Sequence, residues 1–127
     1  DVLVCNAGVA ARTEAITGDG FDVQAQVNFL SHFVLVGACL PVLQRAAEAR
    51  GEARVVTVTS VLRAWPPWAA QELLPSFYQP VPLPGALGGG EGGTKLTLKP
   101  GAAWVRYRQS KLASLLLAGA LPAHLPP

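Results

Sequence analysis

The sequence contains no methionine among its 127 residues, so we expect that Asp1 is not the initiating residue and that the chain is part of a longer protein. Charged residues are scarce, at 14%, and half of the residues are hydrophobic, which excludes a disordered tail and predicts one packed domain. Ten basic and eight acidic residues leave a formal net charge of only +2. A charge this small does not indicate a nucleic-acid-binding surface, so no nucleic-acid partner is expected.

Cysteine is also rare, and each of Cys5 and Cys39 lies in an apolar run without a second thiol or a histidine at metal-ligand spacing. We therefore expect two buried free thiols and no metal site, with His32 and His124 structural or exposed. No secretory or transit segment is visible, and we expect an intracellular protein, either cytoplasmic or membrane-associated. The longest apolar run, residues 29–43, is shorter than the roughly 20 residues that cross a bilayer, so it predicts a buried helix.

Two short apolar runs that are rich in β-branched residues, 1–5 and 54–59, predict buried strands. Between them, residues 19–50 predict a long helix, because apolar residues recur at the helical spacing and Gly51 is a typical stop signal. A strand, a helix and a second strand of these lengths make a βαβ unit. The sequence therefore predicts parallel strands and an α/β fold.

Proline and glycine are concentrated in one segment. Seven of the eleven prolines fall between Arg63 and Ala103, together with a glycine run at residues 88–93, which predicts a long loop. The loop carries four aromatic residues, Trp65, Trp68, Phe77 and Tyr78. They could form an apolar lid over a substrate or touch a membrane surface, and ordinary loop packing is the alternative.

A second helix is predicted at about residues 105–121, where Pro122 ends it. Neither helix has a broad polar face, so both need cover from more sheet, from a second copy of the chain, or from both. We therefore expect a homo-oligomer that forms through the two apolar helices.

Four motifs follow the predicted elements in order. They are the turn Cys5-Asn6-Ala7-Gly8, Asn28 in the long helix, Ser60 at the end of the second strand, and Tyr107-Arg108-Gln109-Ser110-Lys111 in the last helix. This order resembles the short-chain dehydrogenase/reductase superfamily, with its Asn-Asn-Ala-Gly turn, helical Asn, strand-end Ser and Tyr-x-x-x-Lys pair. The sequences at 27–33 and 107–113 look most like its retinol-dehydrogenase-like branch.

The resemblance covers residues 1 to about 62 and 104–121. It implies that residues 1–127 form the central part of a Rossmann-like domain with a doubly wound parallel sheet. The proline- and glycine-rich segment at about 63–103 is then an insertion in that domain.

Tyr107 and Lys111 are four residues apart, so their side chains leave the same face of a helix one turn apart. A neighbouring ammonium group favours the phenolate form of a tyrosine and suits it to act as a general acid or base. The resemblance implies that Tyr107 exchanges a proton with the substrate oxygen while a hydride moves to or from nicotinamide, and that Lys111 also holds the nicotinamide ribose. The alternative is a surface pair without a catalytic role.

Ser60 is expected just beyond the carboxyl end of a strand, where open parallel sheets bind ligands. Its hydroxyl can donate to a carbonyl or alkoxide oxygen, although a plain turn residue is the alternative and Thr59 is the neighbouring candidate. Asn28 resembles the helical asparagine that positions a water in the family's proton relay, through its side chain or through the local backbone. Asparagine is a poor helix former, which agrees with a special role for Asn28.

Asn6, Ala7 and Gly8 resemble the turn that lines the adenosine side of the cofactor, where a small residue allows close approach. Cys5 stands in place of the family's first Asn, and we expect it to be a small buried hydrophobe rather than a nucleophile. The sequence has no glycine-rich turn after a strand to bind the pyrophosphate, and the run at 88–93 does not replace it. The residue that distinguishes NAD from NADP is not in this sequence either, so both cofactors stay open.

The leading hypothesis is an NAD(P)-dependent oxidoreductase that interconverts an alcohol and a carbonyl on a small apolar substrate of the retinoid, steroid or lipid type. Its catalytic set is Tyr107, Lys111, Ser60 and Asn28. The alternative is a truncated, catalytically inactive relative that acts as an interaction module through its two apolar helices. A third alternative is the product of an incomplete gene that does not fold alone.

Overall fold

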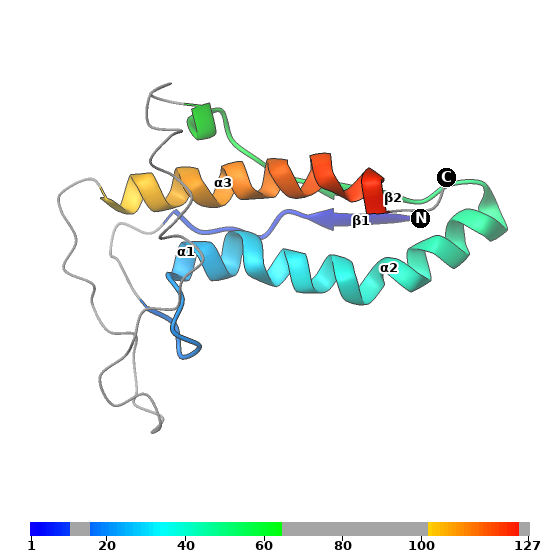
Figure 1. Ribbon diagram of the computed structural model, residues 1–127, viewed down its shortest axis with the longest axis horizontal. Coiled ribbons are helices and arrows are strands. Elements are labelled where there is room, and N and C mark those ends of the chain that lie inside the picture. Colours follow the sequence, from blue (N-terminus) through cyan, green and yellow to red (C-terminus); the bar gives the residue numbers. More distant parts are fainter. Residues whose placement is uncertain (11–15, 65–101, 125–127) are drawn as a thin grey trace.

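The computed structural model describes residues 1–10, 16–64 and 102–124, which form an α/β fold (Figure 1). In chain order the elements are β1 (Val2–Cys5), α1 (Val23–Ala25), the π-helical turn η1 (Gln26–Leu30), α2 (Ser31–Arg50), β2 (Arg54–Thr57), the 3-10 turn η2 (Val61–Ala64), α3 (Ala102–Ala120) and the 3-10 turn η4 (Leu121–His124). Residues 65–101 of the predicted insertion, with its four aromatic residues, lie outside the described residues.

The two strands pair in parallel, as the βαβ pattern predicts. The register runs from Val2 opposite Arg54 to Cys5 opposite Thr57. β2 ends at Thr57, two residues earlier than predicted, although the Val58 N–H still donates to the Cys5 carbonyl at 3.1 Å. Beyond this bond the chain turns toward α3, because the Thr59 hydroxyl donates to the Lys111 carbonyl at 2.7 Å.

The long helix begins at Val23 rather than at Asp19, the start predicted from the sequence. The Asp22 carboxylate accepts hydrogen bonds from the backbone N–H groups of Gln24 and Ala25, at 3.0 and 3.1 Å. Asp22 therefore caps the first turn, and Asp19 lies in the turn before it. Apolar spacing alone cannot locate a helix start that one capping side chain decides.

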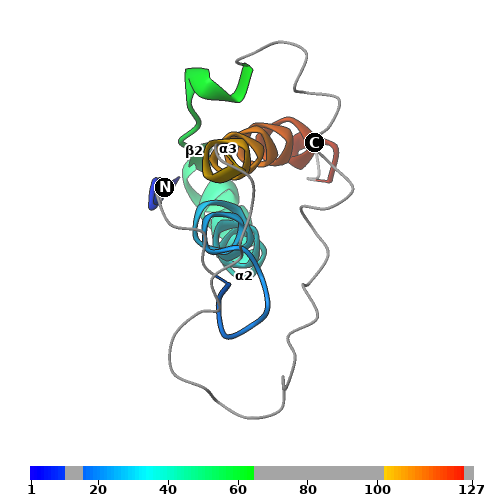
Figure 2. The same ribbon diagram turned by 90° about the vertical axis from the view of Figure 1, so that its left-hand side faces the viewer.

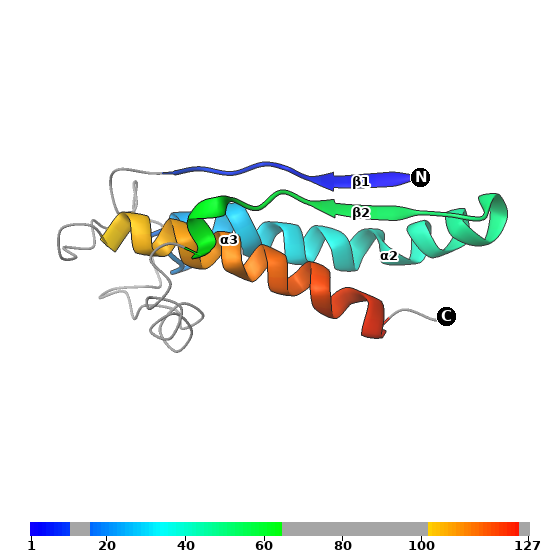
Figure 3. The ribbon, with the colours of Figure 1, turned by 90° about the horizontal axis from the view of Figure 1, so that it is seen from above.

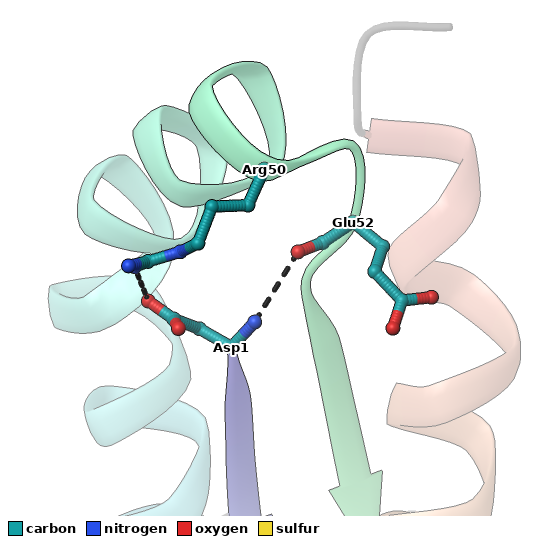
Figure 4. A network of polar contacts seen from close by, with 3 residues as sticks. All are labelled: Asp1, Arg50 and Glu52. Carbon is teal, nitrogen blue, oxygen red and sulfur yellow. Dashed lines mark hydrogen bonds and ion pairs between the residues drawn. The ribbon is translucent and has the colours of Figure 1, made fainter.

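The helix ends where the sequence predicts, at Gly51, which has a φ of 85° and donates its N–H to the Ala47 carbonyl at 2.7 Å. Polar contacts tie this end to the start of β1 (Figure 4). Arg50 forms an ion pair with the Asp1 carboxylate, and the Asp1 backbone nitrogen donates to the Glu52 carbonyl at 3.2 Å. The pair is exposed and adds little stability, but it marks where the two strands start side by side.

The strands form one layer, and α2 and α3 lie in a second layer on one face of the sheet (Figures 2 and 3). The strand residues alternate between this covered face and an exposed face that carries Val2, Val4 and Val56. Between the helices lies a small core of Ala25, Phe29 and Ala113, with Leu30 and Leu117 packed against it. The arrangement is part of a Rossmann-like parallel sheet, with one face covered in the described part of the chain.

Residues 29–43 are helical, as predicted, but most of this run is not buried in the described part of the chain. The buried positions of α2 are His32, Val36 and Ala46, whereas Val34 is 68% exposed. Cys39 is half-buried, so the expectation of two buried thiols is correct for Cys5 alone. The 28-residue helical stretch Val23–Arg50 is long and apolar enough to cross a membrane by length and composition, a test that helices in protein cores also pass.

Candidate active site

The candidate site lies beyond the carboxyl ends of β1 and β2, where η1 and the first half of α3 come together (Figures 1 and 3). Asn28 lies in η1, Tyr107 and Lys111 lie in α3, and Ser60 follows the last residue of β2 by three positions. Open parallel sheets bind ligands at the carboxyl ends of their strands. The topology therefore brings the segments that carry the predicted catalytic residues to one end of the fold.

The Asn28 side chain links the segment after β1 to α3, and none of its surface is exposed. Its Nδ2 donates to the Val9 carbonyl and to Ser110 Oγ, both at 2.9 Å. Its Oδ1 accepts from the Val9 N–H at 2.7 Å. The side chain thus fixes the segment after the Asn-Ala-Gly turn to α3, and both of its amide N–H groups are engaged within the protein.

The backbone around Asn28 is a π-helical turn, in which the Ser31 N–H donates to the Gln26 carbonyl, five residues back instead of four. The Asn28 carbonyl lies 3.0 Å from His32 Nδ1 and accepts from the Ser114 hydroxyl at 3.2 Å. Such turns recur at functional sites. Only the poor helix propensity of Asn28 hinted at this irregularity in the sequence.

Lys111 places its ammonium group where three segments meet. Nζ donates to the Val58 carbonyl at 3.1 Å. A Cβ atom added to Gly8 would lie 3.3 Å from this Nζ and 3.3 Å from Asn28 Oδ1, so a residue without a side chain suits this position. Lys111 is buried, and this burial lowers the pKa of its ammonium from the ordinary value of 10.5.

Tyr107 is half-buried and lies one turn before Lys111 on α3. The Lys111 Nζ is 5.9 Å from the centroid of the Tyr107 ring, so the two side chains share a helix face as their spacing predicts. Trp104 packs edge-on against the same ring, with centroids 6.0 Å apart and an interplanar angle of 88°. The ring is therefore oriented between an indole and an ammonium group.

Ser60 lies in the segment that crosses from β2 to α3, and its Oγ accepts from the Leu62 N–H at 3.2 Å. The neighbouring Thr59 hydroxyl donates to the Lys111 carbonyl. This bond gives Thr59 a structural role. Ser60 thus stays the better candidate for contact with a substrate, in agreement with the family pattern.

Asn6, Ala7 and Gly8 are exposed directly after β1, and Lys111 Nζ lies in the space that a side chain at Gly8 would need. An exposed strip with a missing Cβ beside an ammonium group fits a nicotinamide dinucleotide lying across it, with Lys111 as the residue that would hold the ribose. Cys5, just before the strip, is buried, and burial raises the pKa of its thiol. This agrees with the expectation of a small buried hydrophobe.

Two buried serines of α3 were missed by the sequence reasoning. Ser110 Oγ accepts from Asn28 and donates to the Tyr107 carbonyl at 2.6 Å. Ser114 donates to the Ser110 carbonyl at 3.1 Å and also to the Asn28 carbonyl. The available signal was their four-residue spacing, which puts two small polar residues on one face of an otherwise apolar helix.

A separate hollow of about 660 Å³ lies between the last turns of α2, the end of α3 and β2, and its walls include Leu40, Leu43, Val55 and Leu117. None of the candidate catalytic residues lines it, so it is not part of this site. No group of three or more His, Cys, Asp or Glu residues that could hold a metal ion occurs in the described ranges.

Comparison with curated proteins finds relatives that include dehydrogenases, reductases and oxidoreductases. An uncharacterized oxidoreductase of Schizosaccharomyces pombe is 32% identical over 126 residues, which cover 98% of this chain and 32% of the relative. A short-chain dehydrogenase/reductase of Aspergillus calidoustus is 52% identical over 62 residues, 46% of this chain and 20% of the relative. A polyprenol dehydrogenase of Mus musculus is 52% identical over 60 residues, 46% of this chain and 18% of the relative.

No family model and no solved structure matches the chain. The chain spans between about a fifth and a third of the length of these curated relatives. The order of the motifs, the parallel βαβ unit and the relatives agree with one another. Together they support membership of the short-chain dehydrogenase/reductase superfamily over the part of the relatives that this chain spans.

Proposed function

We propose that the protein containing this chain is an NAD(P)-dependent oxidoreductase that interconverts an alcohol and a carbonyl. The observation that carries the proposal is the convergence at Lys111, whose Nζ lies near the Tyr107 ring and next to Gly8 in the exposed strip. A phenol, an ammonium group and an open surface for a cofactor are the parts that such a reaction needs. The names of the relatives, which include dehydrogenase, reductase and oxidoreductase, support the same class.

In the proposed reaction, the Tyr107 hydroxyl exchanges a proton with the substrate oxygen, and the Ser60 hydroxyl donates a hydrogen bond to the same oxygen. A nicotinamide cofactor, NAD or NADP, accepts or supplies the hydride when it is bound. Lys111 holds the cofactor ribose and keeps a positive charge beside the phenol. Asn28 acts by position, because it fixes α3 through Ser110 and the segment after β1 through Val9.

For the substrate we propose a small apolar alcohol or carbonyl of the retinoid, steroid or lipid type. The sequences around Asn28 and Lys111 are similar to the retinol-dehydrogenase-like branch, and one relative is named a polyprenol dehydrogenase. Both similarities support an apolar substrate class.

The test is a pair of variants of the full-length protein. Tyr107→Phe removes the hydroxyl and keeps the ring, so we expect turnover to fall by at least about 100-fold, with the dissociation constant of the dinucleotide changed by less than about 2-fold. Arg106→Gln, at the preceding position, is the control and should keep full activity. Oxidation of retinol, a sterol and a polyprenol would be followed through formation of reduced NAD or NADP, and an active Tyr107→Phe variant would overturn the proposal.

A second candidate, a non-catalytic interaction module, is favoured by the exposed apolar side chains of the two helices. They include Phe33, Val34 and Leu35 on α2 and Leu115 and Leu116 on α3. The same surface could pair two copies of the protein or touch a membrane. Stable association with another protein, together with no measurable dinucleotide binding, would favour the module, whereas a homodimer with dinucleotide affinity would favour the enzyme.

A further inference from the structure

The segment that carries Ser60 is held to α3 at points on both sides of this residue. Two residues before Ser60, the Val58 carbonyl accepts from Lys111 Nζ at 3.1 Å. Two residues after it, the Leu62 carbonyl accepts from Arg108 Nε at 2.9 Å. Two cationic donors from neighbouring turns of one helix therefore bracket the candidate substrate-binding hydroxyl.

Leu62 connects Arg108 directly to the Ser60 side chain. The Leu62 carbonyl is fixed by Arg108, and the Leu62 N–H donates to Ser60 Oγ at 3.2 Å. Arg108 is only 8% exposed, so its guanidinium donates in a partly desolvated environment, where charge-assisted bonds are stronger. A rigid contact on each side of a single residue leaves Ser60 little freedom to move relative to α3.

Arg108 also directly follows Tyr107 in α3. The helix that presents the phenol therefore also fixes the serine hydroxyl, and one rigid element sets the distance between the two groups. We propose that Arg108 is a positioning residue, which holds the Ser60 hydroxyl in register with Tyr107 by fixing Leu62. The catalytic consequence of this inference rests on the proposed function, whereas the tether itself does not.

The first measurement does not depend on activity. Hydrogen exchange at the Leu62 amide of the full-length protein reports whether its bond to Ser60 persists. We expect Arg108→Gln to speed this exchange by about 10-fold, and Arg108→Lys, which keeps a charged donor, to show a smaller increase. Arg106→Gln is the matched control, because Arg106 is half-buried two positions earlier and makes no hydrogen bond or ion pair with any described residue.

The second measurement is a double-mutant cycle on kcat. Arg108→Gln should lower kcat by about 10-fold to 100-fold and leave the dinucleotide dissociation constant within about 2-fold. Arg108→Lys should restore part of the rate, and it serves as the test variant if Arg108→Gln does not fold. In a Ser60→Ala background the Arg108→Gln effect should shrink to less than about 2-fold, because an arginine that acts through Ser60 has nothing left to position.

The outcomes separate the two claims. Unchanged Leu62 exchange overturns the tether, and faster exchange with fully additive kcat effects overturns the positioning of Ser60. Faster exchange in a protein whose wild type oxidises no alcohol and reduces no carbonyl refutes the proposed function and supports the tether. Faster exchange with coupled kcat effects supports both.

Discussion

Replacement of Asn28 by alanine tests the most connected side chain of the site. The substitution removes the two hydrogen bonds of Nδ2, to Val9 and Ser110, and the bond that Oδ1 accepts from the Val9 N–H. Ser110 keeps its bond to the Tyr107 carbonyl, so the loss falls on the link between η1 and its two neighbours.

The expected loss in the free energy of unfolding follows from the number of hydrogen bonds removed. Each hydrogen bond contributes about 1 kcal/mol net, which gives about 3 kcal/mol for the three bonds of Asn28. Alanine is the better helix former by about 0.6 kcal/mol, which offsets part of this loss. The expected loss in the free energy of unfolding is therefore about 2.4 kcal/mol, a factor of about 60 in the folding equilibrium.

The assay is urea unfolding of the full-length protein, with Ser31→Ala as the matched control. Ser31 is exposed and makes one local bond to the Val27 carbonyl, so we expect the control to lose less than about 0.5 kcal/mol. Asn28→Asp keeps the acceptor and loses both donors, and it should also be clearly destabilised. A loss below about 1 kcal/mol for Asn28→Ala would refute the view that this residue holds the site together.

Three further predictions concern single groups. Burial lowers the pKa of Lys111, so between that lowered pKa and 10.5 the unfolded chain binds more protons than the folded one, and the free energy of unfolding rises with pH. Lys111→Arg should flatten this rise when urea unfolding is measured across alkaline pH, and an unchanged slope would contradict the prediction. Burial raises the pKa of the Cys5 thiol, so iodoacetamide should alkylate Cys5 more slowly than half-buried Cys39 in a mass-spectrometric time course, whereas equal rates would argue against a buried, protonated thiol. Gly51→Ala makes an alanine adopt a φ of 85°, although its side chain would meet open space, and this should lower the free energy of unfolding by about 1 kcal/mol. Gly18→Ala, also in open space but without a positive φ, is the control, and equal effects of the two substitutions would show that the left-handed conformation is not the cause.

The elements and the spacing of the main pair follow from the sequence for a physical reason. β-branched runs and helical periodicity are local properties, so both strands and both helices are predictable from short windows. The parallel pairing of the strands follows from the order strand, helix, strand. The contact between Tyr107 and Lys111 is equally local, because helix geometry alone puts residues four apart on one face. Gly51 as the end of the long helix belongs to the same class.

The parts that could not be predicted depend on tertiary contacts. The π-helical turn at Asn28 goes together with bonds to Val9, Ser110 and Ser114, which come from segments far away in the sequence. The exposure of most of α2 depends on which elements cover it, and apolar composition alone does not show this. The role of Arg108 was hidden because its partner, the Leu62 carbonyl, is a backbone atom that no side-chain pattern reveals.

The wide turn η1 has a consequence for the phase of the long helix. An α-helix rotates by roughly 100° per residue, and a π turn holds one residue more than the helix it interrupts. Gln24, before η1, donates to the Ala103 carbonyl at 2.9 Å, and Asn28, within η1, reaches Ser110 and Ser114 of the same helix α3. Because the wide turn absorbs its extra residue locally, removal of one residue between Gln26 and Leu30 would restore a regular helix and leave the helix on either side in its present phase. The feature lost would then be the wide turn at Asn28 itself, where the backbone carbonyl faces Ser114 of α3.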